Sequence, residues 1–405
     1  MDRLRGALER SSAAALVVIA RSSRDPFLAP WVGAARLGPA LVVCPRRGAA
    51  RLAYLTPLER DEAARSGLAL LSPEDLDLAR WARGGAPAGA RLTALLERAL
   101  QRCGVAPGVI ALAGQAEAGA LALALASLAA DGWRFLDGAP ILRAWRKRKR
   151  AAELAEIRRV AATACEAMWA VAHTLASAET VNGVLVASGQ TVRVGTLRQQ
   201  VARYLVGAGL EQPEGNLIAP GATGAVPHNT GDDGQAVHAG RSLVVDLFPR
   251  GRLFADLTRT FCVATPPGVL EAAHRTVRGA LAVARAGVRP GVHGCELQQA
   301  VCEHFARAGY PTPLDHPGSL RGYVHGLGHG VGYEVHEQPC FHEHEGASGR
   351  LEIGDVFTLE PGLYDPQAGY AVRLEDTCSL GPNGLEILTP LPEALDPRAW
   401  AAAAE

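Results

Sequence analysis

The chain has 405 residues, enough for two or three domains, and its 48% hydrophobic content can fill sizeable cores. Its 41 Lys and Arg residues balance its 41 Asp and Glu residues, which argues against a nucleic acid, an acidic membrane surface or a highly charged partner. The eight cysteines are scattered singly, as is typical of reduced thiols in the cytoplasm rather than of a disulfide framework.

The first third of the chain predicts a small α/β domain over residues 1–145. Its apolar run at 13–20 is too short to span a bilayer, and the charges of Glu9 and Arg21 beside it do not suit an export signal. We therefore expect a buried first strand and a cytoplasmic protein without a membrane segment. The expected elements are a helix at 2–10, strands at 15–20, 40–44 and 51–55, a surface loop at 84–90 and a helix at 118–130.

Five consecutive basic residues, 146–150, follow this domain. A nucleic-acid patch is one interpretation, but the run directly precedes Glu153, Glu156 and a long helical pattern. We interpret it as a solvated linker and helix start at the domain boundary.

From residue 151 the order of elements runs twice, which predicts an α+β domain over residues 151–395. Two similar halves would bury an antiparallel sheet under helices and bring ligands from distant strands to one central cleft. The first half has helices at 151–177 and 194–208 and strands at 216–219, 242–248 and 256–264, and the second has helices at 268–286 and 294–308 and strands at 323–328, 353–359 and 371–380.

Two acids interrupt strand-like sequence in the first half. Asp246 is the single charge in an apolar run, where an isolated carboxylate would be costly to bury unless a metal or another countercharge offset it. Asp256 opens the next strand-like segment, and a hairpin would place the two acids side by side. A salt bridge to Arg259 or a turn is the alternative for Asp256.

Three histidines, His325, His329 and His336, lie in a glycine-rich segment of the second half. Imidazole is the commonest transition-metal ligand, and glycines let the backbone approach a cation closely. We expect His342 and His344, in the acidic loop that follows, to lie on the surface.

Two further acids follow the histidines. Glu360 ends an apolar strand before a Pro-Gly turn, and alternation after residue 371 places Arg373 and Glu375 on one face and Asp376 on the other. Arg373 can hold a metal-bound acid ionised or bind a substrate carbonyl or carboxylate. An ion pair between Arg373 and Glu375 is the alternative.

Four carboxylates and one imidazole form a set of hard donors that suits divalent Mn, Fe, Co or Zn. Their converging negative charges would repel one another, and two divalent cations would neutralise them. The candidate ligands are Asp246, Asp256, His329, Glu360 and Glu375.

The phrases that carry these ligands resemble, in order and interval across residues 151–395, the signature of the Xaa-Pro aminopeptidase and prolidase family of pita-bread metallopeptidases. The preceding segment is similar to the creatinase-like N-terminal domain of its longer members. The phrases are Val-Asp246, Asp256-Leu-Thr-Arg-Thr, Gly-His329-Gly-Val-Gly, Leu-Glu360-Pro-Gly and Val-Arg-Leu-Glu375-Asp.

The resemblance implies two divalent metal ions, with Mn²⁺ expected and Co²⁺, Fe²⁺ or Zn²⁺ as alternatives. Asp246 would chelate the first ion, Asp256 and Glu375 would bridge both, and His329 with Glu360 would complete the second. It also implies that His228, in the phrase Val-Pro-His-Asn, and His336 line the substrate site, with Arg373 behind them.

The implied reaction is hydrolysis of the X-Pro bond at the N-terminus of peptides or in X-Pro dipeptides, by a hydroxide that bridges the two ions. Glu360 would shuttle the proton to the leaving nitrogen, while His336 and His228 would stabilise the tetrahedral intermediate or hold the substrate ends. The expected partners are a peptide with proline at its second position and a second copy of the chain in a homodimer.

One departure from the family pattern lies beside the first metal. Members commonly have Asp-x-Gly, whereas this chain has Asp246-Leu-Phe-Pro-Arg and a slightly short interval to Asp256, which affects substrate preference more than metal binding. The alternatives are an inactive binding or scaffold protein of the same fold and a creatinase-like hydrolase of a small non-peptide amide. The complete ligand set favours the peptidase, because creatinase lacks these ligands, and methionine aminopeptidases usually lack the large N-terminal domain.

Overall fold

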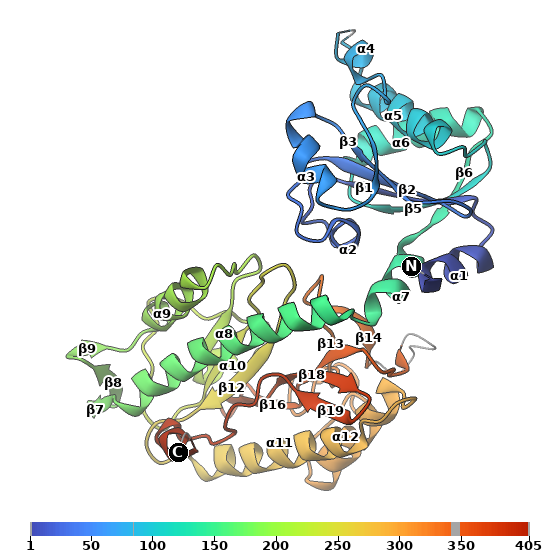
Figure 1. The fold of residues 1–405 in the computed structure, drawn as a ribbon. Coiled ribbons are helices and arrows are strands. Elements are labelled where there is room, and N and C mark those ends of the chain that lie inside the picture. The colour runs from blue at the N-terminus through green and yellow to red at the C-terminus, as the bar shows by residue number, and fades with distance from the viewer. Residues whose placement is uncertain (1, 84, 342–348, 404–405) are drawn as a thin grey trace. The chain divides into compact units, whose positions relative to one another are not determined.

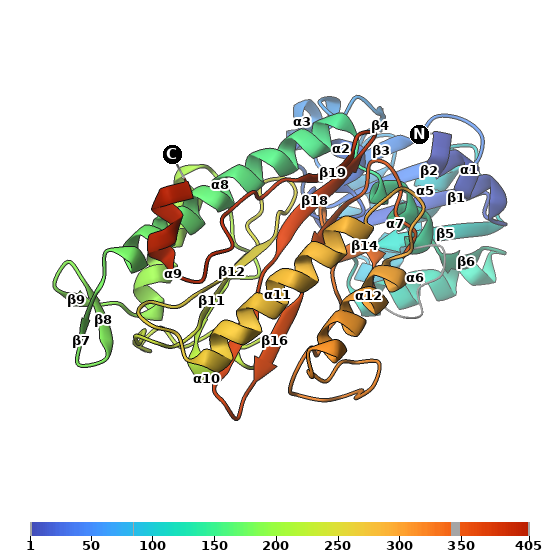
Figure 2. The same ribbon diagram turned by 90° about the horizontal axis from the view of Figure 1, so that it is seen from below.

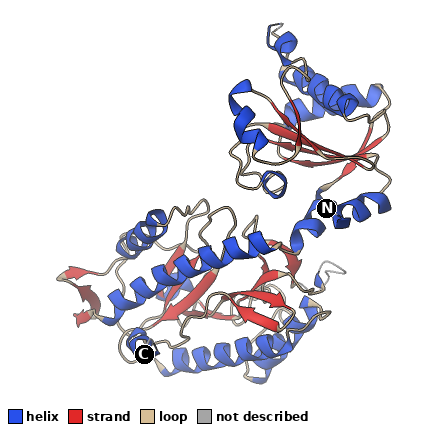
Figure 3. Ribbon diagram, in the orientation of Figure 1, coloured by secondary structure: helices blue, strands red, loops and turns tan. Residues whose placement is uncertain are grey.

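A computed structural model describes residues 2–83, 85–341 and 349–403 (Figure 1). The chain divides into two compact units, residues 1–146 and 147–405. Figure 3 shows helices beside the strands in each unit. None of the helices in the described residues is both long enough and apolar enough to cross a membrane.

The first unit is built on one six-stranded sheet of order β4-β3-β2-β1-β5-β6, in which β2 is antiparallel to both of its neighbours and the other pairs are parallel. The strands are β1 (Ala15–Ala20), β2 (Ala40–Pro45), β3 (Arg51–Tyr54), β4 (Ala69–Leu71), β5 (Val109–Gly114) and β6 (Arg134–Asp137). The helices are α1 (Asp2–Arg10), α2 (Ala29–Val32), α3 (Arg60–Ala64), α4 (Leu78–Arg83), α5 (Ala88–Arg102), α6 (Ala118–Ala130) and α7 (Ala139–Lys147), with a 3₁₀ turn at Pro57–Glu59.

Both faces of this sheet are buried, which explains why its central strands are continuous apolar runs rather than alternating ones. Leu16 and Val18 of β1 pack with α1, α2 and α7, whereas Val17 and Ile19 pack with α5 and α6. The predicted strands and both predicted helices of this unit are confirmed. The predicted loop at 84–90 is wrong for residues 88–90, because Pro87 precedes the first turn of α5; residue 84 lies outside the described residues.

The basic run 146–150 is not a solvated linker, and this prediction is wrong for Arg146, Lys147 and Lys149, which are buried. Lys147 lies 3.0 Å from the buried carboxylate of Asp355, and Lys149 lies 2.6 Å from that of Glu337. The two lysines thus neutralise acids from distant parts of the second unit, a long-range pairing that a local run of charge does not reveal.

The second unit contains two pairs of long helices, each followed by strands (Figure 2). The helices are α8 (Ala151–Ala176), α9 (Val194–Gly207), α10 (Gly221–Gly224), α11 (Gly268–Gly287) and α12 (Gly294–Arg307), and a 3₁₀ helix spans Pro397–Ala403. The strands are β7 (Glu179–Val181), β8 (Val184–Ala187), β9 (Gln190–Thr191), β10 (Leu217–Pro220), β11 (Leu243–Leu247), β12 (Leu257–Phe261), β13 (His329–Gly330), β14 (Glu337–Cys340), β15 (Val356–Leu359), β16 (Gly362–Asp365), β17 (Tyr370–Arg373), β18 (Asp376–Gly381) and β19 (Gly384–Ile387).

The antiparallel sheets β10-β11-β12 and β14-β13-β15-β18-β19 position the candidate ligands, each of which lies in one of their strands or directly beside one. Helix α8 packs against β11, and α11 packs against β15, β16 and β17. A single backbone bridge between Thr258 and Glu375 connects the edges of the two sheets. The predicted hairpin of the first half is confirmed, since β11 and β12 pair with Asp246 opposite Thr258.

Two predictions in the second half need correction. Residues 323–328 form no strand, because this glycine-rich segment is irregular and regular pairing begins only at His329. The predicted strand at 371–380 is interrupted at Leu374 and Glu375 and forms β17 and β18 in different sheets. His342 and His344 lie outside the described residues.

No disulfide bond links the eight cysteines, all of which lie in the described residues. Cys44, Cys262, Cys302 and Cys378 are buried, and the other four are partly exposed. This arrangement agrees with the prediction of reduced thiols, although only half of them are fully buried.

Candidate metal centre and active site

The eight residues selected from the sequence line one cleft in the second unit, with a volume of about 660 Å³. They come from six separate segments of the chain, and His228 and His336 are the most exposed of them. The set comprises His228, Asp246, Asp256, His329, His336, Glu360, Arg373 and Glu375. The structure therefore brings all of them together, while their individual roles remain predictions.

Asp246 lies near the end of β11 and faces Arg373 of β17. One guanidinium nitrogen of Arg373 lies 2.5 Å from Asp246 Oδ2. The other two donate to Thr258 Oγ1 at 3.1 Å and to the Tyr364 hydroxyl at 3.0 Å. The ion pair of Arg373 is thus with Asp246, and the alternative pairing with Glu375 is wrong.

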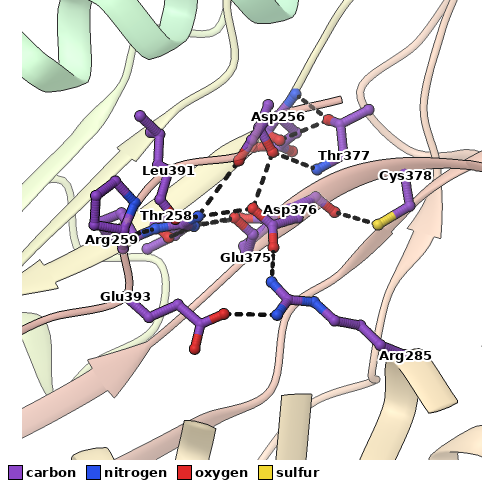
Figure 4. Close-up of polar contacts among 12 residues, drawn as sticks. Asp256, Thr258, Arg259, Arg285, Glu375, Asp376, Thr377, Cys378, Leu391 and Glu393 are labelled. Atoms are coloured by element: carbon purple, nitrogen blue, oxygen red, sulfur yellow. Dashed lines mark hydrogen bonds and ion pairs between the residues drawn. The ribbon is translucent and has the colours of Figure 1, made fainter. Parts of the chain in front are cut away.

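Asp256 and Glu375 lie on the two sides of the junction between the sheets (Figure 4). Thr258, on the same strand edge as Asp256, donates its hydroxyl hydrogen to Glu375 Oε2 at 2.7 Å. Arg259 forms its ion pair with Asp376 at 2.8 Å, so the alternative of an Asp256–Arg259 salt bridge is wrong. Asp376 points away from the cleft, as the alternation predicted.

His329 is placed by two glycines that no other residue can replace without a shift of the backbone. A Cβ atom on Gly328 would lie 2.1 Å from the carbonyl oxygen of Thr358, and one on Gly330 would lie 2.1 Å from that of Gln338. The close approach seats the short strand β13 between β14 and β15. His329 Nε2 then lies 3.3 Å from Glu360 Oε1 and 3.8 Å from Asp256 Oδ2.

The carboxylates of the cleft differ strongly in proton affinity. Burial, followed by the charges of neighbouring acids, raises the pKa of Asp256 and of Glu375 well above the usual range. For Glu360, burial acts in the same direction, but the hydrogen bond and charge of His329 outweigh it and lower the pKa to about 2. Burial lowers the pKa of His329, and its contact with Glu360 more than reverses this effect.

Three carboxylate oxygens in the cleft are buried without a hydrogen-bond donor: Asp246 Oδ1, Asp256 Oδ1 and Glu375 Oε1. Leaving such atoms without a partner is costly, because folding removes them from water. Asp256, His329 and Glu375 also offer ligand atoms that all lie within 4.8 Å of one another. The free oxygens and the mixed oxygen and nitrogen donors fit divalent metal ions.

Sequence reasoning did not assign Thr258, His325 and Tyr364, which support the site. His325 Nε2 lies 2.9 Å from the Tyr364 hydroxyl, which in turn accepts a hydrogen bond from Arg373. Thr258 occupies the position two residues after Asp256, and period-two alternation could have identified it as facing the same cleft. Tyr364 lies on β16, a strand that the sequence analysis missed, so no pattern pointed to it.

Comparison with known proteins places this site in a family. The model of metallopeptidase family M24 matches residues 155–381. An Xaa-Pro dipeptidase of Pyrococcus furiosus is 32% identical over 228 residues, which cover 52% of this chain and 59% of that protein. An uncharacterized peptidase of Bacillus subtilis is 33% identical over 181 residues, or 44% of this chain and 47% of the relative. The matched region thus spans about half of each of these curated relatives.

Solved structures agree over nearly the whole chain. The prolidase of Pyrococcus horikoshii superposes with a TM-score of 0.74 at 22% identity, covering 97% of this chain and 99% of that one. An X-Pro aminopeptidase from Thermotoga maritima gives a TM-score of 0.72 at 19% identity, covering 97% and 98% of the two chains. At such identities the likeness concerns the fold alone.

The chain belongs to metallopeptidase family M24. The resemblance to Xaa-Pro aminopeptidases and prolidases is confirmed, and so is the α+β pita-bread fold. The family implies a peptidase that uses a divalent metal.

Proposed function

We propose that this protein is a dinuclear metal exopeptidase that hydrolyses the bond between the first residue and proline in X-Pro dipeptides or at the N-terminus of X-Pro peptides. One observation carries the proposal. Four carboxylates and one histidine from distant strands converge on a single cleft, where three buried oxygens have no hydrogen-bond donor. Two divalent cations would complete the set, with Mn²⁺ as the first candidate.

In this proposal Asp246, Asp256, His329, Glu360 and Glu375 would hold the two ions, and Asp256 and Glu375 would be shared between them. Metal ions at this position supply a water of lowered pKa and polarise the scissile carbonyl. Burial raises the pKa of Asp246 above its usual value, and the 2.5 Å contact with Arg373 opposes this shift because it favours the charged form of the acid.

Glu360 is the residue to which we assign proton transfer from the attacking water to the leaving proline nitrogen. His329 lowers the pKa of Glu360, so this carboxylate is ionised, which is the form that a general base needs before it takes up a proton. His336 and His228, on the open side of the cleft, are assigned either to stabilise the developing oxyanion or to hold the ends of the substrate.

A dipeptide substrate is favoured by the size of the cleft and by the relatives. The cleft volume of about 660 Å³ lies within the roughly 300–1,000 Å³ typical of small-molecule sites. Two of the similar curated proteins are named Xaa-Pro dipeptidase. Phe248, from the segment after Asp246 that departs from the family pattern, also lines the cleft and is positioned to influence which first residue is accepted.

The test is an assay of X-Pro dipeptides against longer X-Pro-Z peptides and X-Ala controls, with Mn²⁺, Co²⁺ and Zn²⁺ supplied separately to metal-stripped protein. We expect metal-dependent release of free proline from the dipeptides and little cleavage of the X-Ala controls. Metal binding without cleavage of any X-Pro substrate would contradict the proposal.

Two further expectations from the sequence belong to this proposal, namely a homodimer and a cytoplasmic location. Light scattering during gel filtration tests the first. Fractionation of cells that produce the native protein tests the second.

A further inference from the structure

At the junction between the two sheets, regular strand pairing does not set the spacing of two candidate metal ligands. Asp256 immediately precedes β12 and Glu375 immediately precedes β18, and these strands belong to different sheets. The only regular backbone pairing between the described parts of the two edges is the isolated bridge between Thr258 and Glu375. A continuous ladder therefore does not fix the separation of the two carboxylates that are proposed to bridge the metals.

Arg259 contacts residues on both sides of this junction (Figure 4). One of its terminal nitrogens donates to the carbonyl oxygens of Thr258 at 2.9 Å and Glu375 at 2.6 Å, which lie on opposite sides of the junction. The other donates to Asp376 Oδ1 at 2.8 Å and the Leu391 carbonyl at 3.0 Å. The side chain is only 1% exposed, so its planar fork is locked in one orientation.

Asp376 balances the charge of this arginine. Its carboxylate also receives a hydrogen bond from Thr389 at 3.0 Å and forms an ion pair with Arg285. Arg285 in turn contacts Glu393 at 2.6 Å. Because every charge is paired, the network can remain buried without metal and without substrate.

Thr377 makes a second connection across the same junction. Its hydroxyl accepts a hydrogen bond from the backbone nitrogen of Asp256 at 2.9 Å and donates to the carbonyl oxygen of Asp256 at 2.6 Å. The Thr377 hydroxyl on β18 thus hydrogen-bonds both the backbone N–H and the backbone carbonyl oxygen of Asp256.

We propose that Arg259, neutralised by Asp376, acts together with Thr377 as a clamp that sets the spacing of Asp256 and Glu375 for divalent metal binding. These are positioning residues, since they touch neither the cleft nor a metal. The inference rests on the proposed dinuclear site, and it names the residues outside the cleft on which the affinity of that site for divalent metal depends. Groups that orient metal ligands in this way typically contribute about 10–100-fold to affinity.

Isothermal titration of Mn²⁺ into the metal-stripped full-length protein tests the clamp. Arg259→Lys keeps the positive charge beside Asp376 but lacks the planar guanidinium group with its two terminal donor nitrogens. Thr377→Val keeps the shape of the side chain but removes the hydroxyl. We expect both variants to bind Mn²⁺ about 10–100-fold more weakly than the wild type, or to lose one of two ions. Thr377→Ser, which restores the hydroxyl, should recover the wild-type affinity.

Matched controls are available on α11. Arg278→Lys alters an exposed arginine that contacts Glu393, and Thr276→Val removes a hydroxyl that bonds within the helix. Both should bind Mn²⁺ as the wild type does. Urea unfolding in EDTA, run in parallel, reports stability separately, and Thr377→Val decides the question if Arg259→Lys does not fold.

The outcomes separate the clamp from the function. Clamp variants that lose stability in EDTA yet bind Mn²⁺ as tightly as the wild type would show a purely structural role and overturn the inference alone. A wild-type chain that binds no divalent metal would overturn the proposed function and the clamp with it.

Discussion

Glu375 and Asp376 are neighbouring residues, both acidic and both buried, yet they lie in opposite environments. Glu375 faces the cleft with one oxygen that has no hydrogen-bond donor, and its pKa is raised well above the usual range by burial and by nearby acids. Asp376 faces the core, where two arginines and a threonine contact its oxygens. Burial alone therefore does not identify a functional acid; what distinguishes Glu375 is an oxygen without a donor in a residue that lines the cleft.

The largest expected effect is the loss of turnover when the carboxylate of Glu360 in the cleft is removed. Glu360→Gln should lower kcat on an X-Pro dipeptide by about 10²–10⁴-fold, because the amide cannot accept the proton in transit. Glu386→Gln, on the surface strand β19, is the control and should leave turnover unchanged. Metal content measured on the same samples separates loss of proton transfer from loss of metal. Full turnover in a metal-loaded Glu360→Gln variant would remove this residue from the mechanism.

Removing each of the two neighbouring charges should have opposite effects on the metal-stripped protein. Asp376→Asn should lower the free energy of unfolding by about 3–5 kcal/mol, because it breaks a buried ion pair and leaves arginine charge uncompensated. Glu375→Gln should raise it, because the neutral amide avoids the cost of either ionising this carboxyl among other acids or keeping it protonated. Urea titrations in EDTA at neutral pH measure both changes. A loss of stability in both variants would show that the two acids are equally structural.

The gain in the free energy of unfolding of Glu375→Gln over the wild type should grow as the pH rises. The carboxyl of Glu375 has a usual pKa of 4.5, and the raised folded pKa means that the folded protein keeps this proton when the unfolded chain has released it. The stability that the folded protein gains by keeping this proton is therefore fully present below pH 4.5. It is lost as the pH rises toward the folded pKa, at up to about 1.4 kcal/mol per pH unit. Urea titrations in EDTA from pH 4 upward compare the two proteins. A pH-independent difference between them would contradict the assigned shift.

The smallest effect should come from the exposed rim of the cleft. His228→Ala should lower kcat/KM by about fivefold, the value of one hydrogen bond of about 1 kcal/mol, and should leave Mn²⁺ binding unchanged. Steady-state kinetics with an X-Pro dipeptide measure this change, with His238→Ala outside the cleft as the control. A loss as large as that of Glu360→Gln would place His228 among the reacting groups instead.

Local patterns predicted the elements that hold the ligands. The apolar runs around Asp246 and before Glu360 are strands, and the pairing of β11 with β12 follows from their spacing. The fold class followed from the repeated order of elements and from the family phrases. The strands and their pairing depend on residues close together in the sequence, and the fold class depends on the order of such local features along the chain.

Features that depend on distant partners could not be predicted in this way. The basic run was misinterpreted because Glu337 and Asp355, which pair with its lysines, lie about two hundred residues further along the chain. Strand β16, with Tyr364, was missed because Pro361 and Gly362 suggest only a turn. The division between β17 and β18 was missed because the alternation of side chains continues through it.

The pairing of Lys149 with Glu337 bears on where the chain can be divided. A fragment that began at residue 151, at the first residue of α8, would retain the buried acids Glu337 and Asp355 but lose both lysines that neutralise them. Glu337 also accepts a hydrogen bond from the backbone nitrogen of Tyr333, in the segment that carries His336 to the cleft. A fragment that keeps both acids neutralised therefore begins no later than Lys147, inside the basic run whose sequence suggested a solvated linker.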